Sequence, residues 1–207
     1  MRVAVLGATG ATGRLVVEEL VRRGHEVAAL GRTVPTGGPS TVRWVQGDAR
    51  DAAEVADLVS GAGAVVSALG PRKGDSTLHR EVAPCLIAAM HAAGIRRFVG
   101  VSGAGIDVPG DRKSARDRLI SALVRRIGGE AVRDKAVERE LWAASDLDWT
   151  LVRPPRLVDG PATGRLEHAA HRSPRRTSLP RADLAAFVAD LVERSQYVRQ
   201  APLVAGR

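Results

Sequence analysis

The first 32 residues place a glycine-rich turn between a short apolar run and an amphipathic stretch. Residues 3–6 form the apolar run, and Gly7, Gly10 and Gly13 follow it directly. Apolar residues then recur at helical spacing as far as Val21, and residues 25–30 have the composition of a second buried strand. This order predicts a strand, a turn, a helix and a second strand. In such a unit the phosphates of a dinucleotide bind the free N–H groups at the start of the helix.

The glycines follow the spacing G-x-x-G-x-x-G, whereas the commoner dinucleotide-binding pattern is G-x-G-x-x-G. A flexible surface loop is the alternative interpretation, but the flanking elements have the lengths of a mononucleotide-binding half. The second strand ends in Gly31-Arg32-Thr33, where chains that prefer NAD usually carry Asp or Glu. Arg32 would pair with a 2′-phosphate and Thr33 would add a hydroxyl donor. The sequence therefore favours NADP(H) over NAD(H).

Strands and helices continue to alternate along the 207 residues. Apolar runs at 43–46, 64–67, 97–101 and 149–152 predict strands, and stretches at 51–60, 76–93, 133–144 and 181–194 predict helices. This alternation predicts an α/β fold, with one doubly wound Rossmann domain over residues 1–207 and a parallel sheet. A second domain would be cramped in a chain of this length. The site of such a sheet lies at the carboxyl ends of its strands.

Two stretches interrupt the alternation on the expected substrate side of the sheet. Residues 103–130 contain a basic amphipathic segment, interpreted as a surface helix or as a lid over the pocket. Residues 156–180 are rich in glycine, proline, arginine and histidine, and they follow the sixth predicted strand, where a substrate loop would emerge. We therefore expect a small, irregular C-terminal substrate-loop region beside the Rossmann sheet.

The formal net charge of +8 suits an anionic partner, but many arginines stand beside acids, as in Arg116-Asp117-Arg118, which is typical of a solvated surface. Few aromatic residues are present to stack on bases, so no nucleic acid is expected as a partner. No signal peptide or membrane-spanning run is recognised, and one cysteine excludes an internal disulfide. We expect a cytoplasmic monomer or homodimer, without a membrane partner, that acts on a small conjugated or anionic molecule.

Further motifs lie at the predicted strand ends and on the later helices. They are Gly47-Asp48, Val101-Ser102, Lys135 with Glu138, Leu147-Asp148-Trp149-Thr150 followed by Val152-Arg153-Pro154-Pro155, and Asp183. Together with the glycine turn, these motifs resemble the atypical short-chain dehydrogenase/reductase superfamily. Within it, the chain is similar to the NAD(P)H-binding group of NmrA-like proteins and flavin or biliverdin IX-β reductases. The resemblance runs nearly from end to end.

The resemblance implies a role for each of these positions. The glycine turn would bind the pyrophosphate of NADP(H), and Arg32 would bind its 2′-phosphate. Adenine would lie near Asp48, the ribose near residues 68–70, and the nicotinamide near Pro154-Pro155. Two expected catalytic residues, Ser102 and Lys135, would bind the substrate and the nicotinamide ribose, and no metal is expected. The expected cofactor-binding residues are Gly7, Thr9, Gly10, Ala11, Thr12, Gly13, Arg32, Thr33, Asp48, Ala49, Ala68, Leu69, Gly70, Ser102, Lys135, Pro154 and Pro155.

The chain departs from the family pattern at the proton donor. Typical members carry Tyr-x-x-x-Lys, in which the tyrosine protonates the alkoxide formed when hydride reaches a carbonyl. Here Ala131 stands four residues before Lys135, and nothing in the sequence places the only tyrosine, Tyr197, in the pocket. A solvated helix position is the alternative interpretation of Lys135. Candidate replacement acids, each with a surface position as the alternative, are His79, His168 and His171.

Two functions from different classes follow from this departure. The first is an NADPH-dependent oxidoreductase whose acceptor is conjugated, such as a flavin or a quinone, so that no dedicated acid is needed. The second is a non-catalytic NADP(H)-binding sensor of the NmrA-like type, which the same missing tyrosine favours. Isomerase or dehydratase chemistry on the same fold is a further alternative, because a fold does not fix a function.

Overall fold

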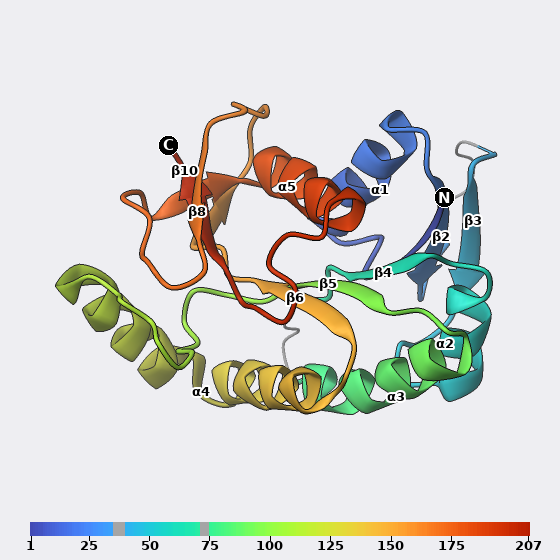
Figure 1. The fold of residues 1–207 in the computed structure, drawn as a ribbon, viewed down its shortest axis with the longest axis horizontal. Coiled ribbons are helices and arrows are strands. Elements are labelled where there is room, and N and C mark those ends of the chain that lie inside the picture. The colour runs from blue at the N-terminus through green and yellow to red at the C-terminus, as the bar shows by residue number, and fades with distance from the viewer. Residues whose placement is uncertain (35–39, 71–74) are drawn as a thin grey trace.

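The computed structural model describes residues 1–34, 40–70 and 75–207, apart from the side chains of residues 125 and 128. Its centre is a sheet of six parallel strands (Figure 1). Their spatial order is β3 (Val42–Gln46), β2 (Glu26–Gly31), β1 (Arg2–Leu6), β4 (Ala64–Ser67), β5 (Arg97–Val101) and β6 (Asp148–Val152). This is the strand order 3-2-1-4-5-6 of a dinucleotide-binding Rossmann sheet. The predicted α/β class and doubly wound parallel sheet are confirmed.

Helices cover both faces of the sheet (Figure 1). One face carries α1 (Gly13–Arg22) and α5 (Arg181–Glu193), and the other carries α2 (Ala52–Val59), α3 (Leu78–Ala92) and α4 (Ala115–Ala144). Strand residues alternate between these two layers, because successive side chains of a strand point to opposite faces. In β1, Val3 and Val5 belong to the core under α1 and α5, while Ala4 and Leu6 belong to the other core.

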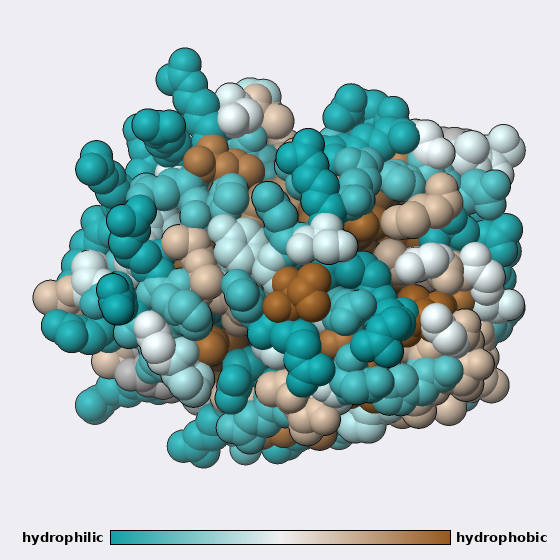
Figure 2. Space-filling view, viewed as in Figure 1, coloured by the Kyte–Doolittle hydropathy of each residue, from teal (hydrophilic) through white to brown (hydrophobic). Residues whose placement is uncertain are grey.

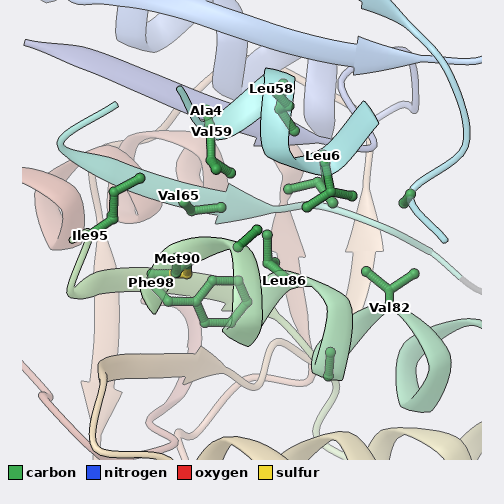
Figure 3. Packing of buried hydrophobic residues seen from close by; sticks show 14 of the residues in the cluster. Ala4, Leu6, Leu58, Val59, Val65, Val82, Leu86, Met90, Ile95 and Phe98 are labelled. Carbon is green, nitrogen blue, oxygen red and sulfur yellow. The ribbon is translucent and has the colours of Figure 1, made fainter. Parts of the chain in front are cut away.

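The second core is the one shown in Figure 3. Leu86 and Met90 of α3 lie against Val65 and Phe98 of the sheet. The ring of Phe98 stacks on the indole of Trp142 from α4, with centroids 3.6 Å apart. This packing fixes α3 and α4 on the sheet, and both helices contribute side chains to the site described below.

The predicted helix 133–144 and the amphipathic segment before it form one element, α4, with a break at Gly129. The backbone there has φ 46° and ψ −120°, which lies outside the helical region. Glycine adopts such a positive φ without the steric cost that a side chain would impose. The first half of α4 therefore leaves the helical layer at an angle of its own and projects beyond the sheet (Figure 1).

The expectation of an irregular segment over residues 156–180 is wrong in part. This segment contains the short strands β7 (Arg156–Val158), β8 (Leu166–Ala169) and β9 (Ser178–Pro180). β7 pairs with β9, and β8 pairs antiparallel with β10 (Leu203–Gly206) at the end of the chain. The carboxylate of Asp183 in α5 accepts hydrogen bonds from the N–H groups of Thr163 and Gly164. These bonds join the loop between β7 and β8 to α5.

Candidate active site

The glycine turn lies at the carboxyl end of β1, and two of its glycines are required by the fold itself. Gly7 has φ +72°, and a Cβ there would lie 2.8 Å from the backbone of Ala68. A Cβ on Gly13 would lie 2.0 Å from the carbonyl oxygen of Gly7. Gly10 is less confined, since its only close neighbour would be the same oxygen at 3.2 Å. The turn thus brings the start of α1 against β1 with backbone atoms exposed to a ligand.

A groove of about 290 Å³ opens in front of this turn, at the carboxyl ends of β1, β2, β3 and β4. Most of the predicted cofactor residues meet there. The groove is lined by Gly7, Thr9, Gly10, Arg32, Asp48, Ala49, Ala68, Leu69 and Gly70, together with Leu30, Gly31, Gly47, Arg50, Asp75 and Leu78. Ala11, Thr12, Gly13 and Thr33 neighbour this lining in the chain without being part of it.

The wall of the groove at Asp48 is held by a small charge network that the sequence analysis missed. The N–H of Asp48 donates to the Glu54 carboxylate at 2.5 Å, and the Asp48 carboxylate accepts from the N–H of Arg50 at 3.0 Å. The guanidinium of Arg50 pairs with Asp75 and Glu81, each at 2.5 Å. These contacts hold the wall of the groove next to the expected adenine position.

Ser102 and Lys135 lie beside the end of β5. The N–H of Ser102 donates to the Val152 carbonyl at 2.7 Å, which joins this residue to β6. The Ser102 hydroxyl oxygen is buried and has no hydrogen-bond partner in the part of the chain that the structure describes. Lys135 donates from Nζ to the Val101 carbonyl at 2.9 Å, and only 12% of its side chain is exposed. A solvated position for Lys135 is therefore wrong.

His79 joins Lys135 in a buried cluster, so its expected surface position is wrong. Its Nδ1 lies 3.2 Å from Lys135 Nζ, and the residue is 3% exposed. Burial, with a smaller contribution from the Lys135 charge, lowers the pKa of His79 to about 2. The ring is therefore neutral at physiological pH. A charged Lys135 can only donate to Nδ1, and in that state the ring proton is on Nε2, which has no partner among the described residues.

Two acids of α4 complete this cluster. Glu138 is buried and lies 3.4 Å from Lys135 Nζ, and burial raises the pKa of its carboxyl. Asp134, also buried, accepts hydrogen bonds from the N–H groups of His79 at 2.8 Å and Arg80 at 3.0 Å. Asp134 thereby caps the start of α3, where the first N–H groups of a helix have no partner within it. The cap joins α3 to α4 and positions His79 beside Lys135.

A second hollow, of about 380 Å³, lies beside the segments that follow the carboxyl ends of β5 and β6. Its walls include the segment 103–105, the predicted nicotinamide neighbours Pro154 and Pro155, and apolar side chains of α4 and β10. Lys113 also lines it, but its ammonium is directed to the carbonyls of Ala104 and Ile106 and to Ser121. The interior is accordingly apolar. We call this hollow the substrate pocket.

The remaining candidate acids lie outside both hollows. The Tyr197 hydroxyl hydrogen-bonds to Nδ1 of His168 at 2.8 Å, on the strand β8. His171 lies 3.6 Å from Asp111. None of these three side chains lines the groove or the substrate pocket as the described residues form them.

Comparison with known proteins identifies the family of this site. A family model described as NAD(P)H-binding matches residues 7–195. The chain belongs to this NAD(P)H-binding family. Its cofactor is accordingly a nicotinamide dinucleotide.

Individual relatives cover the chain to different extents. An uncharacterised Mycobacterium tuberculosis protein is 32% identical over 102 residues, which is 49% of this chain but only 12% of that protein. A Burkholderia pseudomallei structure, of a protein described as exported, has 28% identity and a TM-score of 0.81, and 99% of each chain is covered. A Streptococcus pneumoniae structure, described as a candidate NADH-flavin reductase, has 25% identity and a TM-score of 0.82 over the whole of both chains.

Lys135 was predicted from the family resemblance. The roles of His79 and Asp134 do not follow from local sequence, because their contacts join residues about 55 positions apart in the chain. The one local signal was that His79 and Val82 occupy the same face of a predicted helix, which is the apolar face.

Proposed function

We propose that the protein is an NADPH-dependent oxidoreductase that transfers hydride to a conjugated acceptor without a catalytic tyrosine. One observation supports this most directly: Ser102 and Lys135 lie together at the end of β5, next to Gly103 of the substrate pocket, while the tyrosine position is Ala131 and Tyr197 is bound to His168. Such a site can orient a cofactor and an acceptor, but it has no phenol to protonate an alkoxide.

The residues present fit a nicotinamide cofactor. Gly10 lines the groove without a side chain, and the buried Ser102 hydroxyl lacks a partner within the described chain. In the bound state the cofactor supplies the hydride. The glycine turn would hold its pyrophosphate, Arg32 its 2′-phosphate, and Lys135 a ribose hydroxyl near Val101.

The chemistry of the acceptor follows from the missing acid. A simple ketone becomes a strongly basic alkoxide as hydride arrives, and it needs a proton donor at that moment. His79 is a poor donor, because a ring with a pKa of about 2 carries no extra proton at neutral pH. A flavin, a quinone or a linear tetrapyrrole spreads the charge over a conjugated system that solvent can protonate. The apolar walls of the substrate pocket suit such a planar ring system.

A non-catalytic NADP(H) sensor is the second candidate, and the same missing tyrosine favours it. The two functions differ in one measurement. The reductase should oxidise NADPH steadily when riboflavin, FMN or a soluble quinone is supplied. A sensor should bind NADPH and leave it unchanged with every such acceptor, and this result would overturn the proposed activity.

Cofactor preference provides a direct test of Arg32. NADPH should bind at least about tenfold more tightly than NADH, because a charge-assisted hydrogen bond contributes roughly 1.5–3 kcal/mol. Arg32→Ala should remove this preference and leave NADH binding nearly unchanged. Calorimetric titration of both proteins with both cofactors measures the effect. Equal affinities in the unmodified protein would contradict the proposed role of Arg32.

Ser102→Ala tests the absence of a dedicated acid. With a conjugated acceptor, turnover should fall by about one to two orders of magnitude at most, since the change removes a positioning hydrogen bond and leaves the proton source intact. Steady-state kinetics over pH should show no steep limb from a tyrosine-like group. Rapid reduction of an aliphatic ketone that collapses in His79→Ala would instead reveal a replacement acid.

The remaining expectations concern the setting of the reaction. In the described chain, no helix is long and apolar enough to cross a membrane. A cytoplasmic location, a small-molecule substrate, a monomeric or homodimeric state and the absence of nucleic-acid binding stay predictions. So does the assignment of residues 1–207 to one domain.

A further inference from the structure

The first half of α4 exposes apolar side chains that the fold does not cover. Leu119 is 72% exposed and Ile127 is 78% exposed. With Leu123 they recur every four residues, which aligns them along one side of the helix. Ile120 and Val124 widen this stripe. Apart from Met1, these five residues are all the exposed large apolar side chains of the described chain. We call them the α4 stripe.

The positive charge of the chain is concentrated around the same helix. Residues 112–127 and 172–176 contain nine basic residues and one acidic residue, Asp117, so that their net charge equals the +8 of the whole chain. The two segments are adjacent in space. Arg116 Nη2 donates to the Arg175 carbonyl at 2.9 Å, and the backbones of Arg112 and Arg172 form an isolated parallel β-bridge. Hydrophilic side chains predominate over the face of the molecule in Figure 2, with apolar ones scattered between them.

The helix is anchored to the body through its opposite side. Ser121 is buried, and its hydroxyl contacts both Lys113 Nζ at 3.0 Å and the Ala104 carbonyl at 3.3 Å. Gly105 lies directly under Val124, where an added Cβ would be 2.7 Å from that side chain. Leu119, Leu123 and Ile127, the most exposed members of the α4 stripe, therefore face away from the anchored side, and Ile120 and Val124 form its edge next to the body.

We propose that the α4 stripe and the arginines around it dock on an anionic lipid bilayer. A helix with an apolar side flanked by basic residues lies in the membrane interface, where apolar side chains enter the acyl region and arginines meet lipid phosphates. A second copy of the chain fits less well, because a symmetric contact would bring the same positive charge against itself. Nucleic acid fits less well too, because the stripe is aliphatic and offers no aromatic ring for stacking.

Docking through this surface has a consequence for the substrate pocket. Ile120 and Val124 belong both to the stripe and to the wall of that pocket. The docked protein would hold the pocket next to the lipid, within reach of an acceptor dissolved in the bilayer. This consequence rests on the proposed reductase function, whereas the docking itself does not.

Vesicle co-sedimentation of the full chain tests the docking without reference to activity. The protein should bind vesicles of phosphatidylcholine mixed with phosphatidylglycerol at least about tenfold more tightly than vesicles of phosphatidylcholine alone, and added salt should weaken the binding. Leu119→Asp combined with Ile127→Asp should lower the partition coefficient by at least about tenfold. Arg118→Glu combined with Arg126→Glu should have a similar effect through charge alone.

Arg194→Glu combined with Arg199→Glu is the matched control, because it changes the net charge equally with two exposed arginines outside the segments 112–127 and 172–176. It should bind vesicles nearly as the unmodified protein does. All variants should retain their circular-dichroism spectrum and their NADPH affinity in solution.

Four results would overturn the docking proposal. In the first, the unmodified protein stays in the supernatant at low ionic strength, and in the second, Leu119→Asp with Ile127→Asp binds anionic vesicles normally. In the third, the control variant loses binding as strongly as Arg118→Glu with Arg126→Glu. In the fourth, the protein forms a dimer without lipid, and this dimer dissociates in Leu119→Asp with Ile127→Asp. The last result, seen by sedimentation velocity, would make the stripe a contact between copies. Loss of NADPH oxidation with intact vesicle binding would count against the reductase function only.

Discussion

Gly10→Val is expected to abolish NADPH binding while the protein remains folded. Gly10 lines the groove at the turn before α1, and its N–H already donates to the Gly7 carbonyl at 3.0 Å. A Cβ at this position would meet only that oxygen, at 3.2 Å, so the backbone needs little adjustment. The valine methyl groups would instead occupy the space in which a pyrophosphate approaches the backbone. Calorimetric titration measures the binding, and circular dichroism with thermal melting measures the fold.

Two other glycines separate binding from folding in this experiment. Gly63→Val, far from the groove, should leave NADPH affinity unchanged, because an added Cβ there has ordinary contacts only. Gly13→Ala should instead lower the melting temperature, since its Cβ would lie 2.0 Å from the Gly7 carbonyl oxygen. If Gly10→Val bound NADPH normally, the turn would be a structural element and the proposed cofactor position would be wrong.

The central sheet was predictable because its signals are local. The inner strands β1 and β4 are buried on both faces and appear as short apolar runs at residues 3–6 and 64–67. The glycine turn and the long helices are also indicated by residues close together in the chain, namely the spaced glycines and the apolar residues at helical spacing. Since the strands of a doubly wound sheet end at one edge, their order along the chain also predicted that Gly7, Arg32, Asp48 and Ala68 would share a groove.

The features that were missed depend on contacts between distant residues. β8 forms only because its antiparallel partner β10 arrives at the end of the chain. Asp134 has the sequence environment of a surface helix residue, yet it caps α3 across a separation of 55 residues. Likewise, the fully buried charge of Arg153 could not be inferred, because all of its partners come from segments that the periodicity left unassigned.

The buried guanidinium of Arg153 depends on its ion pair with Asp111. Asp111→Ala should therefore destabilise the protein by about 3–5 kcal/mol. The guanidinium is 0% exposed and forms a bidentate pair with the Asp111 carboxylate at 2.6 and 2.7 Å. It also donates to the carbonyls of Ile106, Ala170 and Ala201, and so joins β6 to the walls of the substrate pocket. Removal of Asp111 leaves this buried charge unpaired, which is costly because few other groups can compensate it.

Urea unfolding of the single variants and of the double variant with Arg153→Met measures this pair. The double variant should lose less stability than the sum of the two single variants, because it buries no unpaired charge. Asp57→Ala is the matched control: Asp57 pairs with Arg43 on the exposed surface, and its loss should cost less than about 1 kcal/mol. Equal losses in Asp111→Ala and Asp57→Ala would contradict the structural role of the buried pair.

The pH dependence of stability gives the same pair a second, independent test. Burial alone would raise the pKa of Asp111, but the hydrogen bonds from Arg153 hold it below its ordinary value. A carboxyl with a lowered pKa in the folded state stabilises the protein above its unfolded pKa of about 3.9, and this stabilisation is lost as the pH falls through the folded value. Between neutral pH and about pH 3, the unfolding free energy should therefore fall more steeply in the unmodified protein than in Asp111→Ala. Parallel curves would mean that the Arg153 contact does not set the charge state of Asp111.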